Sequence, residues 1–210
     1  MVINKELLSS NAASLGVDLS EDMLDKFDLL ASLLIEQNKT MNLTAITQPN
    51  EVVVKHFADS LSLLSVSYTH LTMVDSTAKK LAYVASTLDK LSLSAETLHA
   101  RAEEAGKDHA YREQYDIVCS RAVAALNVLC EYCLPFVKVG GTFVAMKSAK
   151  AQEELQLAEK AISTLGGKTV GQKSFTLSDG GERTLIIIKK ISQIPPKYPR
   201  PSAQIAKKPL

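Results

Sequence analysis

Polar residues that could serve a nucleotide-like ligand follow three predicted strands. In chain order these groups are Asp75-Ser76-Thr77, Ala102-Glu103 and Arg121. An acid just past a strand can accept hydrogen bonds from both hydroxyls of a ribose. Each group taken alone is typical of a helix cap or a surface charge. Three of them at strand ends favour a ligand site at the carboxyl edge of a sheet.

Two further pairs of residues have spacings that could support chemistry. His56 and Asp59 stand at i, i+3 on a predicted helix, where they could face a ligand or RNA, although pairing with each other is the simpler interpretation. Cys130 and Cys133 form a C-x-x-C in an apolar helical stretch without a second such pair. Buried thiols are therefore favoured over zinc or redox chemistry, and we expect no metal site. No catalytic residue can be assigned.

The C-terminal part of the chain is basic. No acidic residue follows Glu182, whereas that stretch carries seven lysines and arginines. Such a tail is a candidate contact for a polyanion, and a solvated tail is the alternative. The candidate phosphate contacts are Lys197, Arg200, Lys207 and Lys208. Cations of this kind position nucleic acid without reading its sequence.

Composition limits the class of protein. The chain has 210 residues, 46% of them hydrophobic and 22% charged, with a formal net charge of +1, as expected for a globular domain. The three cysteines do not make a disulfide framework, which fits a reducing cytosol. The sequence shows neither an apolar signal core nor a membrane span. We expect a cytoplasmic monomer without a membrane partner.

The N-terminal part of the chain predicts helices. Ser20 can cap a helix whose apolar residues recur at helical spacing from Met23 to Ile35. Asn42-Leu43-Thr44 predicts a turn, because these polar side chains can bond to nearby backbone groups. A second helix is expected over residues 50–64.

From Leu71 onward, strands alternate with helices. The expected strands cover residues 71–74, 97–100, 116–120, 142–147, 170–177 and 184–190, and the expected helices cover 78–91, 124–137 and 150–164. This order favours an α/β fold with a parallel sheet covered by helices on both faces. Asp179-Gly180-Gly181 predicts a terminal hairpin that adds an antiparallel edge.

These patterns suggest three regions: an N-terminal helical region over 1–64, an α/β core over 65–192 and a basic tail over 193–210. Five of the seven prolines lie in this tail, so we expect it to be extended. The core lacks one feature of nucleotide-binding domains. Glycine is absent between Gly16 and Gly106, so the first half has no strand followed by a glycine-rich turn that would let the backbone approach a cofactor.

Several short stretches together carry a resemblance to a known family. They are Asn42-Leu43-Thr44-Ala45-Ile46, Lys55-His56-Phe57-Ala58-Asp59-Ser60, Val74-Asp75-Ser76, Arg101-Ala102-Glu103, residues 116–124 and Lys197-Tyr198-Pro199-Arg200. In this order the chain resembles the bacterial 16S ribosomal RNA small-subunit methyltransferase G family, also called the glucose-inhibited division protein B family.

The resemblance implies a Rossmann-like class I methyltransferase fold with additional N-terminal helices. It implies transfer of a methyl group from S-adenosylmethionine to N7 of a guanine in 16S ribosomal RNA, with that RNA or the small ribosomal subunit as partner. By the same resemblance, Asp75, Ser76 and Thr77 would lie beside the cofactor ribose. Ala102 and Glu103 would flank the adenine, and Arg121 would line the cofactor site.

The chain departs from the family at one place. The family's first strand, its Asp-Val-Gly-x-Gly-x-Gly-Phe-Pro loop and the following helix have no counterpart, a loss of about thirty residues. The segment Ser65 to His70 matches nothing in the family. We interpret it as the junction of a deletion or of a faulty gene model, with a central strand missing from the sheet.

The chemistry leaves alternative functions open. Guanine N7 carries a lone pair and no proton, so methyl transfer to it needs orientation and charge stabilisation and no general base. A catalytically inactive, methyltransferase-like RNA-binding protein is the main alternative. A dehydrogenase is a third possibility, because an acid after a strand also occurs in NAD sites. The order of the motifs, ending in Lys-Tyr-Pro-Arg, argues against it.

Overall fold

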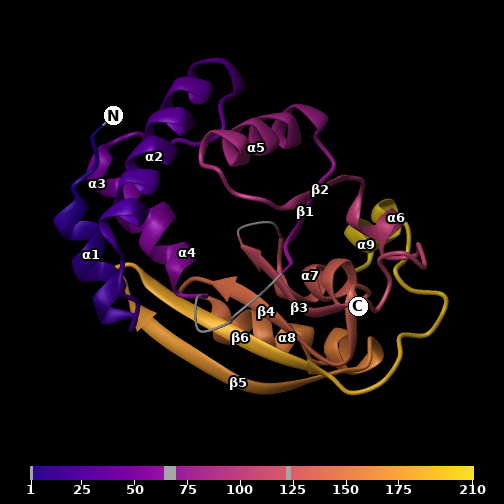
Figure 1. The fold of residues 1–210 in the computed structure, drawn as a ribbon. Helices are drawn as coiled ribbons and strands as arrows, with labels where there is room; N and C mark the ends of the chain where they lie inside the picture. Colours follow the sequence, from indigo (N-terminus) through magenta and orange to yellow (C-terminus); the bar gives the residue numbers. More distant parts are fainter. Residues whose placement is uncertain (1, 64–69, 122–123) are drawn as a thin grey trace. The chain divides into compact units, whose positions relative to one another are not determined.

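The computed structural model describes residues 2–63, 70–121 and 124–210 (Figure 1). Within these ranges, no helix is both long and apolar enough to cross a membrane. The chain divides into two compact units. Unit 1 comprises residues 1–99 and 176–181, and unit 2 comprises residues 100–175 and 182–210.

Unit 1 begins with helices, as predicted. They are α1 (Lys5–Ser14), α2 (Glu21–Met41), α3 (Pro49–Val52), the π-helical turn η1 (Val53–Ala58) and α4 (Asp59–Leu61). The Ser20 side chain accepts a hydrogen bond from the Met23 amide and caps α2. The expected helix over 50–64 is formed by α3, η1 and α4 in succession, with π-helical geometry in its middle. Its last predicted residue lies outside the described residues.

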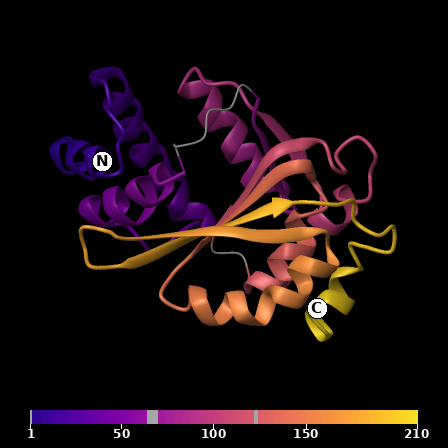
Figure 2. The ribbon, with the colours of Figure 1, turned by 90° about the horizontal axis from the view of Figure 1, so that it is seen from below.

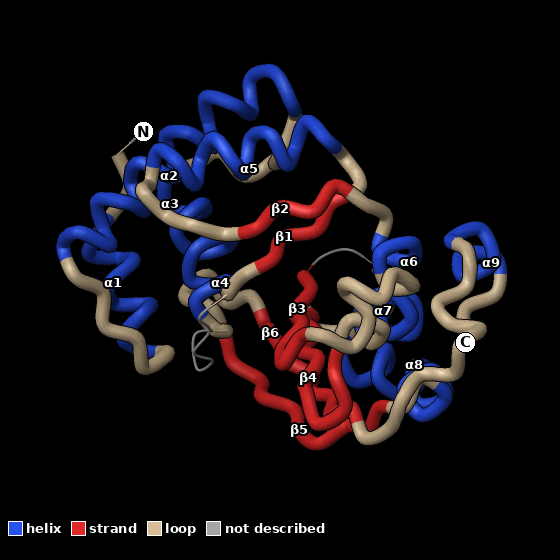
Figure 3. The backbone as a smooth tube through the Cα atoms, turned by 45° about the vertical axis from the view of Figure 1, so that its right-hand side comes forward, coloured by secondary structure: helices blue, strands red, loops and turns tan. Residues whose placement is uncertain are grey.

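Unit 1 also contains a small parallel sheet. Strand β1 (Thr72–Asp75) pairs with β2 (Glu96–His99), and α5 (Ala78–Lys90) connects them (Figure 3). In this register Val74 lies beside Leu98. The sequence predicted all three elements to within two residues.

Unit 2 contains a four-stranded sheet of order β3-β4-β6-β5. Its strands are β3 (Tyr115–Arg121), β4 (Val137–Lys147), β5 (Gly167–Thr176) and β6 (Glu182–Lys190), and its helices are α6 (Ala102–Ala105), α7 (Leu126–Cys133), α8 (Ala151–Thr164) and α9 (Ser202–Lys207). Strands β3 and β4 are parallel, whereas β4 and β6 are antiparallel. The α/β class and the terminal hairpin are therefore confirmed.

The core of unit 2 lies between the sheet and two helices. Helices α7 and α8 pack together beneath the sheet in Figure 2. Phe143, Ile186 and Ile188 are fully buried against Leu129 and Ala158. Apolar burial of this extent is the main stabilising contribution to such a unit.

The expected single sheet is wrong for the described residues. Strands β1 and β2 form one sheet, and β3 to β6 form another, so β1 and β3 are both edge strands. Each edge exposes an apolar residue, with Val74 and Ile117 both at 38% relative exposure. The described part of residues 2–71 contributes no strand. Among the described residues, neither edge is paired with a further strand.

The expected extended tail is also wrong. Residues 202–207 form α9, and the tail buries Ile194, Tyr198 and Ile205 in unit 2. Pro201 precedes this helix, at a position where proline's missing N–H has no consequence, so a proline-rich sequence could still form it.

Candidate functional site

The Asp75-Ser76-Thr77 turn lies at the carboxyl end of β1. The Asp75 Oδ1 atom accepts a hydrogen bond of 2.7 Å from the Thr77 amide, which shapes the turn into α5. The Asp75 Oδ2 atom lies 3.8 Å from Lys80 Nζ, and the Asp75 side chain is 36% exposed. The His99 ring nitrogen Nε2 lies 3.1 Å from the Ser76 carbonyl oxygen. The carboxylate thus has a fixed orientation and accessible surface.

A cavity in unit 1 extends from this turn. It lies between α2 and α5, has a volume of about 730 Å³, and is lined by Thr77, Lys80 and Leu33 among others. The sequence did not predict this cavity, because its walls come from two helices whose packing is a tertiary property.

The Ala102-Glu103 pair opens α6, as predicted for the end of β2. The Glu103 side chain is 9% exposed and lies 3.9 Å from Arg101 Nη1. The Glu103 carboxylate also raises the pKa of Tyr132, whose main perturbation is burial. A largely buried carboxylate in a four-residue helix has a restricted orientation, as a ligand contact requires.

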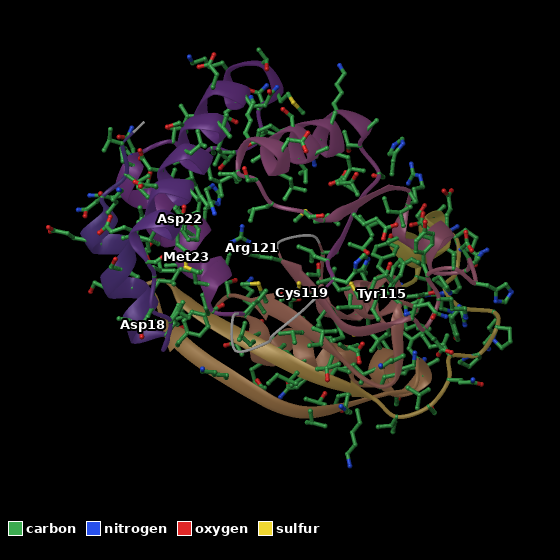
Figure 4. All side chains as sticks on the ribbon, viewed as in Figure 1. Asp18, Asp22, Met23, Tyr115, Cys119 and Arg121 are labelled. Carbon is green, nitrogen blue, oxygen red and sulfur yellow. The ribbon has the colours of Figure 1, made fainter. Side chains whose placement is uncertain are left out.

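Arg121 ends β3 in unit 2. Its backbone pairs with Met146 of β4, and Figure 4 shows its side chain beyond those of Cys119 and Tyr115 on the same strand. The two residues after it, Ala122 and Val123, belong to the matching motif but lie outside the described residues.

A partly buried ion pair holds the chain just beyond Arg121. The Lys147 ammonium donates to the Ala124 carbonyl at 2.5 Å and lies 2.8 Å from a Glu154 carboxylate oxygen. The same Glu154 oxygen accepts a hydrogen bond of 2.8 Å from the Leu126 amide. Sequence reasoning missed this pair. The one feature of the sequence that could have indicated the pair is a lysine at the end of the predicted apolar strand 142–147.

His56 lies in the π-helical turn η1 of unit 1, and Asp59 is the first residue of α4. The His56 Nε2 atom lies 2.9 Å from the hydroxyl oxygen of Thr44, in the predicted turn after α2. Asn38 donates to the Thr44 carbonyl and accepts from the Thr44 amide, which fixes that turn. Asp59 is buried, at 5% exposure. Both motif residues thus take part in packing this segment.

The C-x-x-C pair consists of buried thiols, as predicted. Burial raises the pKa of Cys130 and raises that of Cys133 to about 12. Among the described residues, no group of three or more His, Cys, Asp or Glu side chains is arranged to hold a metal ion.

The four cations of the tail differ in availability. The Arg200 guanidinium donates two hydrogen bonds, from Nε and Nη2, to the fully buried carboxylate of Glu131, at 2.8 and 2.7 Å. This pairing anchors the tail and leaves Arg200 the least available of the four to a phosphate. Lys197, Lys207 and Lys208 are exposed.

Comparison with known proteins decides the family. The model of the rRNA small subunit methyltransferase G family matches residues 23–69 and 65–186. Curated relatives named "Ribosomal RNA small subunit methyltransferase G" include those of Alkaliphilus metalliredigens and Brevibacillus brevis. Both are 39% identical over 99% of this chain, and the alignments cover 99% and 100% of the relatives. The chain belongs to the rRNA small subunit methyltransferase G family.

The alignments to these relatives are longer than the chain. The alignment to the Alkaliphilus relative spans 236 positions, so at least 26 of them have no counterpart among the 210 residues. The family match itself is broken into two stretches that meet over residues 65–69. Both findings agree with the junction inferred from the sequence, which lies mostly outside the described residues.

Two solved structures align with parts of this chain. TrmN from Thermus thermophilus is 13% identical, with a TM-score of 0.46 over 62% of this chain and 40% of its own length. M. jannaschii TYW2 in complex with AdoMet is 15% identical, with a TM-score of 0.42 over 58% of each chain.

The residues present fit part of S-adenosylmethionine. The oriented and accessible carboxylate of Asp75 suits a ribose, and Ala102 with the largely buried Glu103 suits an adenine edge. The methionine end requires close backbone approach, for which glycine is suited. Residues 17–105 contain no glycine, and no described strand precedes β1. Residues 17–105 therefore offer no glycine turn for the methionine end.

Proposed function

We propose that this protein is an S-adenosylmethionine-dependent methyltransferase that acts on N7 of a guanine in 16S ribosomal RNA. The observation that carries the proposal is the match to rRNA small subunit methyltransferase G proteins over nearly the whole chain, which includes the strand-end residues. The proposal includes a cytoplasmic monomer that takes ribosomal RNA or the small subunit as substrate.

Asp75, Ser76 and Thr77 are the proposed contacts of the cofactor ribose. Ala102 and Glu103 are the proposed contacts of the adenine, and Arg121 is proposed to line the cofactor site. Support comes from their places at the ends of β1, β2 and β3, where ligands of α/β sheets bind. The bound cofactor would supply an electrophilic methyl group.

Guanine N7 attacks such a methyl group in an in-line displacement. The carbon–sulfur bond breaks as the nitrogen–carbon bond forms, and positive charge moves to the base. Since N7 carries no proton, the protein's tasks are to orient the base and to stabilise that charge. The proposed site accordingly contains ligand-orienting residues and no general base.

Lys197, Lys207 and Lys208 are the proposed RNA phosphate contacts, with Arg200 as a fourth, less available cation. Their support is exposure on a tail that α9 and buried residues hold against unit 2. A fixed array of cations can position RNA before the target base enters the site.

One observation favours a second function, RNA binding without methyl transfer. At least 26 positions of the alignment to the Alkaliphilus relative have no counterpart in the chain, and no glycine occurs between Gly16 and Gly106. In that case the tail would retain its RNA contacts while the cofactor site lost its function.

Transfer of labelled methyl groups to naked 16S RNA and to small subunits separates the two functions. The methyltransferase proposal expects label in N7-methylguanine, and loss of that label in Asp75→Asn and Glu103→Gln. The exposed Lys168→Gln is the matched control and should keep activity. RNA binding without any label would support the second function and contradict the first.

A further inference from the structure

A single arginine joins the C-terminal tail to the helix that carries Glu103. Arg112 Nη1 donates to the Gly106 carbonyl at 3.0 Å and to the Tyr198 carbonyl at 2.8 Å. Its Nη2 donates to the Ile194 carbonyl at 3.1 Å. Gly106 ends α6, whereas the other two carbonyls belong to the tail. One guanidinium therefore bridges segments more than 80 residues apart.

The residue beside Arg112 strengthens the same junction. The Glu113 carboxylate accepts a hydrogen bond of 3.0 Å from the Ile194 amide and lies 2.9 Å from the ammonium of Lys190. The Lys190 side chain is fully buried and also donates to the Leu134 carbonyl at the end of α7 and to the Val137 carbonyl at the start of β4. Glu113 has a positive φ of 55°. Such a backbone persists where surrounding contacts enforce it.

The tail also packs directly against the end of α6. A Cβ atom added to Gly106 would lie 3.0 Å from the Pro135 side chain and 3.4 Å from that of Pro199. Within α6, the Ala105 and Gly106 amides donate to the carbonyls of Arg101 and Ala102. Movement of the tail at Pro199 would thus displace the last turn of a helix only four residues long.

A second route connects the same two places through α7. Tyr132 lies close enough to both Glu103 and Glu131 for the two carboxylates to raise its pKa, and Glu131 holds Arg200 of the tail. This route is electrostatic, whereas the Arg112 route consists of direct hydrogen bonds. Arg112 is therefore the side chain through which the tail most directly fixes α6.

We propose that Arg112 is a positioning residue that makes α6 and the C-terminal tail one mechanical unit, so that RNA on the tail and cofactor at Glu103 bind with linked affinities. The linkage rests on the proposed function, whereas the mechanical connection does not. By thermodynamic reciprocity, each ligand must change the affinity of the other by the same factor.

Amide hydrogen exchange on the ligand-free chain tests the mechanical connection. In Arg112→Gln we expect exchange at Ala105 and Gly106 to accelerate roughly tenfold, because the bridging hydrogen bonds are lost, while amides within α8 keep their rates. Arg112→Lys keeps the positive charge but loses the planar guanidinium with its several donors. Exchange at Ala105 and Gly106 in this variant should be intermediate between the original chain and Arg112→Gln. Lys107→Gln removes an exposed charge beside α6 and is the matched control. Unchanged exchange in α6, or equal acceleration in α8, would overturn the proposal.

Paired titrations test the linkage. S-adenosylmethionine is titrated with and without a 20-nucleotide single-stranded RNA, and the RNA with and without S-adenosylmethionine. In the original chain and in Lys107→Gln, we expect each ligand to raise the affinity of the other by the same factor, about threefold or more. In Arg112→Gln we expect neither affinity to change. Two ligands that bind independently would overturn the linkage. If neither ligand binds the original chain, the proposed function fails, and the exchange rates still decide the role of Arg112.

Discussion

At the scale of single residues, Arg200 was predicted to contact RNA and has a structural role as well, because it is the partner of Glu131. The Glu131 carboxylate is fully buried and receives two hydrogen bonds from the Arg200 guanidinium, plus one of 2.8 Å from the Arg200 amide. An isolated buried charge is costly, whereas a bidentate partner offsets much of that cost. The Lys-Tyr-Pro-Arg motif thus closes the tail onto α7.

Replacing Arg200 should therefore destabilise the folded state. We expect Arg200→Ala to lower the free energy of unfolding by about 3 kcal/mol, because it leaves the Glu131 carboxylate buried without its partner. Urea denaturation measures this change. Lys207→Ala, on the same tail but exposed, is the control and should change stability by less than about 0.5 kcal/mol. Equal stability of the two variants would show that the ion pair contributes nothing.

The cysteines provide a second test at this scale. Cys119 is exposed, whereas Cys130 and Cys133 are buried, and burial raises the pKa of the Cys130 and Cys133 thiols. We expect a thiol reagent at pH 8 to modify one cysteine in the folded protein and three after denaturation, since the thiolate is the reactive form. Rapid reaction of two or more thiols in the folded protein would contradict this arrangement.

At the scale of elements, the tail combines a buried side with exposed cations. Alanine at Lys197, Lys207 and Lys208 should lower the slope of log affinity against log salt by about 2 for single-stranded RNA, because each lost phosphate contact removes about 0.7. Filter binding at several salt concentrations measures the slope, with Lys168→Ala as the control. If the variant has the same slope as the original chain, these lysines do not contact RNA phosphates.

Local patterns predicted most elements correctly, while long-range contacts decided the exceptions. Apolar runs and the Ser20 cap predicted α2, α5, α8 and all six strands. The conformation of the tail was missed because Ile194 and Ile205 are buried by residues distant in sequence. The Lys147–Glu154 pair was missed because it depends on how β4 meets α8 and on the Ala124 carbonyl, 23 residues before Lys147. Composition shows a lysine, but only the fold shows the carbonyl and carboxylate beside it.

At the scale of the whole molecule, the described chain has two sheets where one was expected. The absence of glycine between Gly16 and Gly106 and the family resemblance both predict a missing strand, and the alignment to the Alkaliphilus relative is longer than the chain. An unpaired strand edge exposes backbone donors and acceptors, so an additional strand that pairs with such an edge would gain hydrogen bonds. We therefore expect the restored chain to be more stable and to bind cofactor more tightly.

The most direct test is a calorimetric titration of S-adenosylmethionine into two proteins. One is the 210-residue chain, and the other carries the additional segment of the Alkaliphilus metalliredigens relative between Leu64 and His70. The restored chain should bind at least about tenfold more tightly, and Asp75→Asn should weaken its binding by roughly tenfold. Equal affinity of the two proteins for S-adenosylmethionine, or an affinity that Asp75→Asn does not change, would contradict the proposed site.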